Sequence, residues 1–154
     1  MADTYTQIYI QFVFAVQNRV SLIRPEWEEE LFKYITGIVQ NKSHKMIAIN
    51  GMPDHLHMFV GFGPADHISE FIKVVKGESS KWIKDRNLVK GKFNWQEGYG
   101  AFSYSRSHID RVYHYIMNQK KHHQIRTFQD EYRELLKKFD VDFNERYIFK
   151  FVDY

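Results

Sequence analysis

Two spacings of hydrophobic residues, one typical of strands and one typical of helices, alternate along the chain. Their order constrains the fold more than any other feature. Residues 8–16 place strongly apolar side chains at every second position, which is typical of a strand with one apolar face. From Pro25 the spacing of apolar residues becomes helical. Two short apolar runs, 46–50 and 55–62, are separated by glycine and proline and therefore predict a hairpin.

The second half of the chain again alternates between helix and strand. An apolar stripe predicts a helix over 67–86, and alternation around two glycines predicts a strand with a kinked start over 95–105. Ser107 is expected to cap a helix that continues to about residue 123. Thr127 is expected to cap a last helix.

The predicted order is strand, helix, strand, strand, helix, strand, helix, helix. It matches an α+β fold, a ferredoxin-like split βαβ sandwich whose four-stranded antiparallel sheet carries helices on one face. The last two predicted helices are additional C-terminal helices, and the other face of the sheet is expected to be free for a site. With 154 residues, 44% of them hydrophobic, the chain is expected to form a single domain over 1–154.

Composition limits the kinds of metal site and of partner that this chain is expected to have. The chain has no cysteine, so any metal must be held by nitrogen and oxygen ligands. The net charge of +3 is too small to establish nucleic-acid binding. No apolar stretch approaches the ~18 residues of a membrane span, and no signal segment is recognisable, so we expect a cytoplasmic protein with no membrane partner.

Two histidines two residues apart are the first candidate metal ligands. On a strand, His55 and His57 point to the same side, and Leu56 and Met58 point to the other. The apolar side is expected to face the helices, so the histidines are expected to face away from the core. Two imidazoles leave the coordination of a divalent ion incomplete, which calls for a third ligand. The alternative is a pair of ordinary hydrogen-bonded core histidines.

Tyr115 and Gln119 lie one helical turn apart and therefore share one flank of the predicted helix, together with His108. An adjacent arc is expected to be buried, and Tyr113 is assigned to it as a structural residue. Such a tyrosine and glutamine pair is common on helix surfaces. Its interest comes from its coexistence with the histidine pair. The members of the adjacent arc are Ile109, Val112, Tyr113 and Ile116.

Three ordered motifs resemble those of the single-tyrosine HUH transposases of the insertion-sequence-200/605 kind, and the resemblance covers nearly the whole chain. They are Pro53-Asp54-His55-Leu56-His57, the stretch Trp95-Gln96-Glu97-Gly98-Tyr99-Gly100-Ala101-Phe102-Ser103, and Tyr115-Ile116-Met117-Asn118-Gln119.

The resemblance implies a role for each matched residue. His55 and His57 correspond to the paired metal ligands, Gln119 to a further ligand and Tyr115 to the nucleophile. It also implies a Mg²⁺ or Mn²⁺ cofactor, single-stranded DNA with hairpin ends as partner, and a homodimer whose active site is shared between subunits in some relatives. The host compartment is expected to be the cytoplasm of a bacterium or archaeon, with association to the nucleoid when DNA is bound.

The implied chemistry suits these residue types. A divalent ion neutralises a phosphate oxygen and stabilises developing charge, while Tyr115 attacks the phosphorus. A phenol has a reference pKa near 10, so it needs a cation or a base nearby to react at neutral pH. The resemblance implies a 5′-phosphotyrosine product and a free 3′-hydroxyl. A different 3′-hydroxyl is then able to attack that bond and rejoin strands.

Basic and aromatic residues are candidates for DNA contacts, although a lysine face is commonly just solvated. Tyr99, Phe102 and Tyr104 fit either base stacking or core packing, and core packing is favoured. The basic candidates are Lys73, Lys76, Lys81, Lys84, Lys120, Lys121, His122, His123 and Arg126.

Three other functions stay open. A non-catalytic module that binds single-stranded nucleic acid needs neither the tyrosine nor a metal. A replication-initiating or plasmid-mobilising nuclease has similar chemistry but usually carries further domains. A purely structural metal-binding dimer forms no covalent DNA product.

Overall fold

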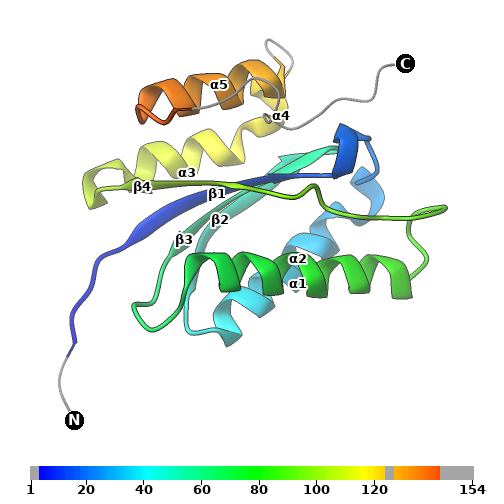
Figure 1. Ribbon diagram of the computed structural model, residues 1–154, viewed down its shortest axis with the longest axis horizontal. Helices are drawn as coiled ribbons and strands as arrows, with labels where there is room; N and C mark the ends of the chain where they lie inside the picture. Colours follow the sequence, from blue (N-terminus) through cyan, green and yellow to red (C-terminus); the bar gives the residue numbers. More distant parts are fainter. Residues whose placement is uncertain (1–3, 124–126, 143–154) are drawn as a thin grey trace.

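The computed structural model describes residues 4–123 and 127–142. Its centre is a four-stranded antiparallel sheet in the order β2-β3-β1-β4 (Figure 1). The strands are β1 (Tyr9–Ala15), β2 (Lys45–Met52), β3 (His55–Gly61) and β4 (Gly100–Tyr104). The helices are α1 (Pro25–Asn41), α2 (Ile68–Asp85), α3 (Ile109–Met117), α4 (Gln119–His122) and α5 (Phe128–Lys138), with 3-10 turns η1 (Gln17–Arg19) and η2 (Arg106–His108). This confirms the predicted fold class.

One face of the sheet packs on α1 and α2, as predicted (Figure 1). Alternate residues of β1 and β3 point into this layer, and Phe12, Phe14, Leu56 and Met58 are fully buried there. Burial of such apolar area is the main stabilising term of the fold. Within the described residues, no helix is long and apolar enough to span a membrane.

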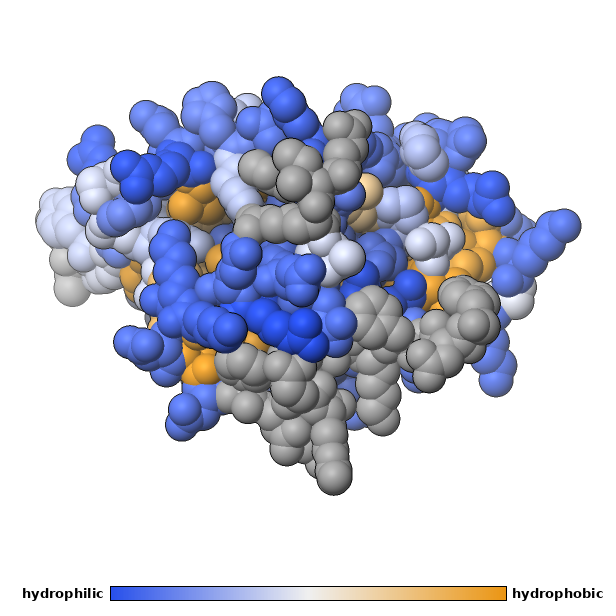
Figure 2. Space-filling view, turned by 90° about the horizontal axis from the view of Figure 1, so that it is seen from above, coloured by the Kyte–Doolittle hydropathy of each residue, from blue (hydrophilic) through white to orange (hydrophobic). Residues whose placement is uncertain are grey.

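The other face of the sheet is not free, contrary to the prediction. Helices α3, α4 and α5 cover it (Figure 1). Val13 of β1 packs against α5, and Phe59 of β3 packs against α3. The central strands are therefore buried on both faces, as expected of a sheet between two layers. Figure 2 looks onto the outer side of this second layer, where hydrophilic side chains predominate.

Element boundaries differ from prediction around the second layer. Strand β4 is shorter than 95–105, and Trp95 forms only an isolated bridge with Val16. Ser107 does not cap a helix, because η2 precedes α3 and His108 stands at the N-cap of α3, where no side-chain capping bond forms. Thr127 does cap α5, since its hydroxyl accepts the backbone N–H of Asp130 at 3.2 Å. That prediction is confirmed.

The predicted third helix is interrupted at Asn118, which separates α3 from α4. Asn50 on β2 explains the break. Its side-chain amide donates to the carbonyls of Ile116 and Met117, both at 3.1 Å. These bonds anchor the end of α3 to the sheet and satisfy carbonyls that a helix end leaves without partners.

Gly51 makes the turn between β2 and β3 tight. A Cβ atom at this position would lie 2.3 Å from the carbonyl oxygen of His55 and 2.6 Å from Cδ2 of Leu56. Only glycine allows the two strands to approach so closely. The turn therefore delivers His55 as the first residue of β3, at the end of the sheet where the site forms.

Candidate active site

His55 and His57 lie side by side on β3, on the face covered by α3 to α5. Both are fully buried, so they do not face solvent as the sequence had suggested. The cover comes from α5, because the ring of Phe128 stacks on His55 at 3.8 Å between centroids. The guanidinium carbon of Arg19 lies 4.4 Å from the centroid of the same Phe128 ring. The same-side placement of the two histidines is as predicted.

Two neighbours fix the orientation of the histidine rings. Nδ1 of His55 donates to Asp54 Oδ1 at 2.7 Å, and Nδ1 of His57 donates to Gln11 Oε1 at 2.8 Å. Asp54 is held in turn by Arg19, whose Nε donates to Oδ2 at 2.8 Å. With Nδ1 engaged in this way, Nε2 of each ring points into the site, where it could hold a metal ion.

Asp54 remains a carboxylate in this position. Burial raises its pKa, but the hydrogen bond from His55 and the charges of His55 and Arg19 outweigh burial and lower the pKa of Asp54 to about 2. An ionised Asp54 is a strong acceptor for the His55 Nδ1 proton.

Glu131 of α5 is a central residue of the site that sequence reasoning missed. Its side chain is buried, and Oε1 lies 3.0 Å from Nε2 of His57. Oε2 accepts hydrogen bonds from Nε2 of Gln119 at 3.0 Å and from the Tyr115 hydroxyl. Burial raises the pKa of Glu131, but the charge of His57 and bonds from His123, His57 and Tyr115 lower it far below its ordinary value.

A signal for Glu131 exists in the sequence. The residue lies three positions after Phe128 and next to Tyr132, within the apolar stripe of α5. A carboxylate on the buried side of an amphipathic helix costs several kcal/mol unless it is paired, so it marks a site.

Gln119 is the first residue of α4 and is fully buried. Its Oε1 lies 3.4 Å from Nε2 of His55. His123, which the sequence assigned to DNA contacts, lies inside the site instead, with Nε2 3.1 Å from Gln119 Oε1 and 3.3 Å from Glu131 Oε1.

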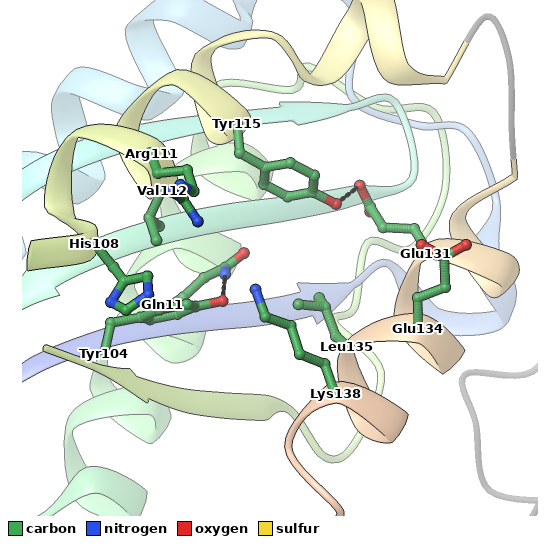
Figure 3. A pocket seen from close by; sticks show the side chains of 10 residues that line it. All are labelled: Gln11, Tyr104, His108, Arg111, Val112, Tyr115, Glu131, Glu134, Leu135 and Lys138. Atoms are coloured by element: carbon green, nitrogen blue, oxygen red, sulfur yellow. Dashed lines mark hydrogen bonds between the residues drawn. The ribbon is translucent and has the colours of Figure 1, made fainter.

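Tyr115 completes the group. The ring is half-buried, its centroid lies 6.1 Å from that of His57, and its hydroxyl donates to Glu131 (Figure 3). The four residues singled out from the sequence therefore meet at one place within one chain. Tyr113, by contrast, is 38% exposed and does not belong to the buried stripe, which corrects the prediction.

The donor set fits a divalent cation. His55, His57 and Glu131 each offer a ligand atom, and these atoms lie within 4.8 Å of one another. Nε2 of His57 faces a carboxylate oxygen although its other nitrogen already donates to Gln11, so a cation or a further proton must lie between them. Imidazole nitrogens combined with carboxylate and amide oxygens are ligands of many divalent ions, and they include none of the thiolates that soft metals prefer.

The predicted basic residues do not form one surface. Lys73, Lys81 and Lys84 are exposed on α2, on the sheet face opposite the site (Figure 1). Lys76 is instead a structural residue, because its ammonium donates to the carbonyls of Gln96 at 2.9 Å and Gly98 at 2.6 Å. Burial lowers the pKa of Lys76 to about 8, against an opposing effect of Glu97.

The remaining basic candidates lie after α3. Lys120 forms an ion pair with Glu28 at 2.9 Å, so its charge is already partly compensated. Lys121 is exposed near the site. Arg126 lies outside the described residues.

The protonation of His55 predicts how stability depends on pH. Burial, aided by the charge of His57, lowers the pKa of His55 to about 4 against the opposing effect of Asp54. An unfolded histidine titrates near 6.5, so the unfolded chain binds more protons between pH 6.5 and 4. Stability is therefore complete above pH 6.5 and falls as the pH drops through this window, by about 3 kcal/mol at most.

Urea unfolding in EDTA at pH 7.0 and 4.5 measures this effect. In His55→Gln, the difference in the free energy of unfolding between the two pH values is expected to be smaller by most of that amount. An equal pH dependence in the wild type and the variant would show that His55 does not titrate as described.

Comparisons with known proteins concern the fold and the family of the chain. The ISDra2 transposase TnpA of Deinococcus radiodurans is 22% identical over 118 residues, which cover 73% of this chain and 84% of that protein. The structure of a candidate transposase from Deinococcus radiodurans R1 has a TM-score of 0.61 at 22% identity, covering 77% of this chain and 96% of that one. The structure of a REP-associated tyrosine transposase bound to a REP hairpin has a TM-score of 0.59 at 15% identity, covering 100% of this chain and 93% of that one.

The fold thus places the chain among proteins built like tyrosine transposases. A family model makes the assignment more specific, because the model of IS200-like transposases matches residues 4–119, well over half of the chain. The chain belongs to the IS200-like transposase family. The resemblance found in the sequence is confirmed.

Proposed function

We propose that this protein cleaves and rejoins single-stranded DNA through a 5′-phosphotyrosine bond to Tyr115. One observation carries the proposal. A single buried carboxylate, Glu131, contacts both the Tyr115 hydroxyl and Nε2 of His57, so the nucleophile and the metal-ligating histidine converge on one point. His55, His57, Gln119 and Glu131 would hold Mg²⁺ or Mn²⁺.

The residues of the chain divide the reaction between them. A bound divalent ion would supply charge neutralisation of the scissile phosphate. Glu131 orients the phenol through the hydrogen bond that it accepts. Its lowered pKa makes it a weak base, so the phenol proton passes on to solvent when Tyr115 attacks phosphorus. The new bond joins the tyrosine oxygen to phosphorus, and the bond from phosphorus to the 3′-oxygen breaks. The 3′-oxygen takes up a proton and remains available to reverse the step.

The choice of substrate class rests on a relative. A relative of similar fold is bound to a REP hairpin, which supports hairpin-containing single strands as the DNA of this chain. Its assembly is proposed to be a homodimer, and residues 1–154 are proposed to act as one cytoplasmic domain. Within the single chain the Tyr115 ring lies 6.1 Å from that of His57, centroid to centroid, which supports a site that one subunit is able to complete by itself.

A covalent-product experiment tests the proposal. Hairpin DNA from the flanks of the protein's own gene, labelled on the 3′ side, is incubated with Mn²⁺ or with EDTA and resolved on a denaturing protein gel. We expect a labelled protein band with Mn²⁺, and at least a hundredfold weaker band in EDTA because charge neutralisation is worth several kcal/mol. DNA that binds without any covalent band would favour the non-catalytic binding module.

A further inference from the structure

A pocket of about 220 Å³ opens beside the Tyr115 hydroxyl, between β4, α3 and α5 (Figure 3). Tyr115 and Glu131 line its inner end. Val112 and Leu135 form apolar walls, and Tyr104 lies along the side formed by the sheet. The volume is below the ~300 Å³ of common small-molecule sites, which suits one unit of a polymer better than a complete ligand.

Two cationic side chains enter this pocket from different helices. Arg111 reaches in from α3 and Lys138 from α5 (Figure 3). Among the described residues, neither forms an ion pair or hydrogen bond with a carboxylate. The ammonium of Lys138 lies 5.7 Å from the centroid of the Tyr104 ring. Glu134 also lines the pocket and adds a negative charge. The two cations at its sides offer donors to a phosphate, against the carboxylates of Glu131 and Glu134 in the same lining.

The aromatic wall is held in place by the active site itself. Nε2 of Gln11 donates to the Tyr104 hydroxyl at 3.0 Å, while Oε1 of the same amide accepts from His57. This bond ties the orientation of the Tyr104 ring to the histidine that faces the nucleophile. A held aromatic ring beside two cations offers a nucleotide a stacking surface for its base and donors for its phosphate.

We infer that this pocket binds the nucleotide adjacent to the scissile phosphate, with its base against Tyr104 and its phosphate on Arg111 and Lys138. The inference rests on the proposed function, because it is the Tyr115 hydroxyl that marks where the scissile phosphate lies. The pocket positions the strand for attack, and Arg111, Lys138 and Tyr104 are positioning residues rather than residues of the reaction itself.

Binding of fluorescein-labelled (dT)15 in EDTA, followed by anisotropy over a range of salt concentrations, tests the phosphate contacts. The double variant Arg111→Gln/Lys138→Gln is expected to reduce the slope of log K against log salt by about 0.7, because one phosphate contact to a single strand contributes about that much. The matched control Lys73→Gln/Lys84→Gln removes the same charge from α2 on the opposite face, and its slope is expected to change by less than half as much.

Ultraviolet cross-linking of the same (dT)15 probe, with peptide mapping by mass spectrometry, tests the stacking contact. We expect thymine adducts on Tyr104. An unchanged slope in the pocket variant, or adducts confined to peptides outside β4, α3 and α5, overturns the inference. Binding of (dT)15 in EDTA needs no cleavage, so the two proposals are tested separately. A covalent Tyr115 product combined with an unchanged slope would refute the pocket alone. A reduced slope without any covalent product would refute the chemistry alone.

Discussion

Tyr115→Phe is expected to abolish the covalent DNA product while (dT)15 affinity stays within about threefold of the wild type. The substitution removes only the hydroxyl, which is the attacking group in the proposed reaction and a donor to Glu131. Loss of a covalent nucleophile lowers turnover on the order of 10⁶-fold in enzymes where it has been measured, so no labelled band should be detectable. Lost donation to Glu131 costs only about 1–3 kcal/mol, leaving the fold intact.

Tyr113→Phe is the matched control for this experiment. Tyr113 lies on the same helix two residues earlier, is 38% exposed, and has only a ring contact with His114 among its described interactions. Its variant should form product as the wild type does. A labelled band of normal intensity in Tyr115→Phe would assign the nucleophile to another residue.

His57→Gln is expected to weaken Mn²⁺ binding at least a hundredfold and to remove the metal-dependent product. His57 presents Nε2 to the Glu131 carboxylate from a fully buried position. Substitution of residues that merely support metal ligands costs about 10- to 100-fold in affinity, so loss of a ligand should cost more. Glutamine retains an amide donor for Glu131, which limits the cost of leaving that buried charge without a partner.

Isothermal titration with Mn²⁺ measures the affinity, and circular dichroism melting reports whether the variant is folded. The control is His67→Ala, because His67 is exposed at the start of α2 on the opposite side of the sheet. Its affinity should equal that of the wild type. Wild-type Mn²⁺ affinity in a folded His57→Gln protein would place the metal elsewhere.

Local patterns were sufficient to predict the strands and helices that form the sheet and its first layer. Period-two alternation depends only on neighbouring residues, so the pairing of His55 and His57 on one side of a strand followed directly. The same held for Tyr115 and Gln119, which one helical turn brings together even though Asn118 interrupts the helix between them.

Long-range packing could not be predicted in the same way. The burial of the histidines depends on where α5 docks, and nothing local specifies that Phe128 stacks on His55. Glu131 joins His57 across 74 positions in the chain. The break at Asn118 likewise depends on Asn50, which lies 66 residues before the carbonyl of Ile116 that it binds.

The shared carboxylate has a thermodynamic consequence. Glu131 has two oxygens, and four side chains already contact them: His57, His123, Gln119 and Tyr115. A ligand that engages either oxygen must therefore alter the free energy of the phenol hydrogen bond. Linkage is reciprocal, so whatever draws Tyr115 away from Glu131 also changes the affinity of the histidines for that ligand by the same factor. In the proposed reaction, cation occupancy and release of the nucleophile would be coupled equilibria, with Glu131 as the group common to both.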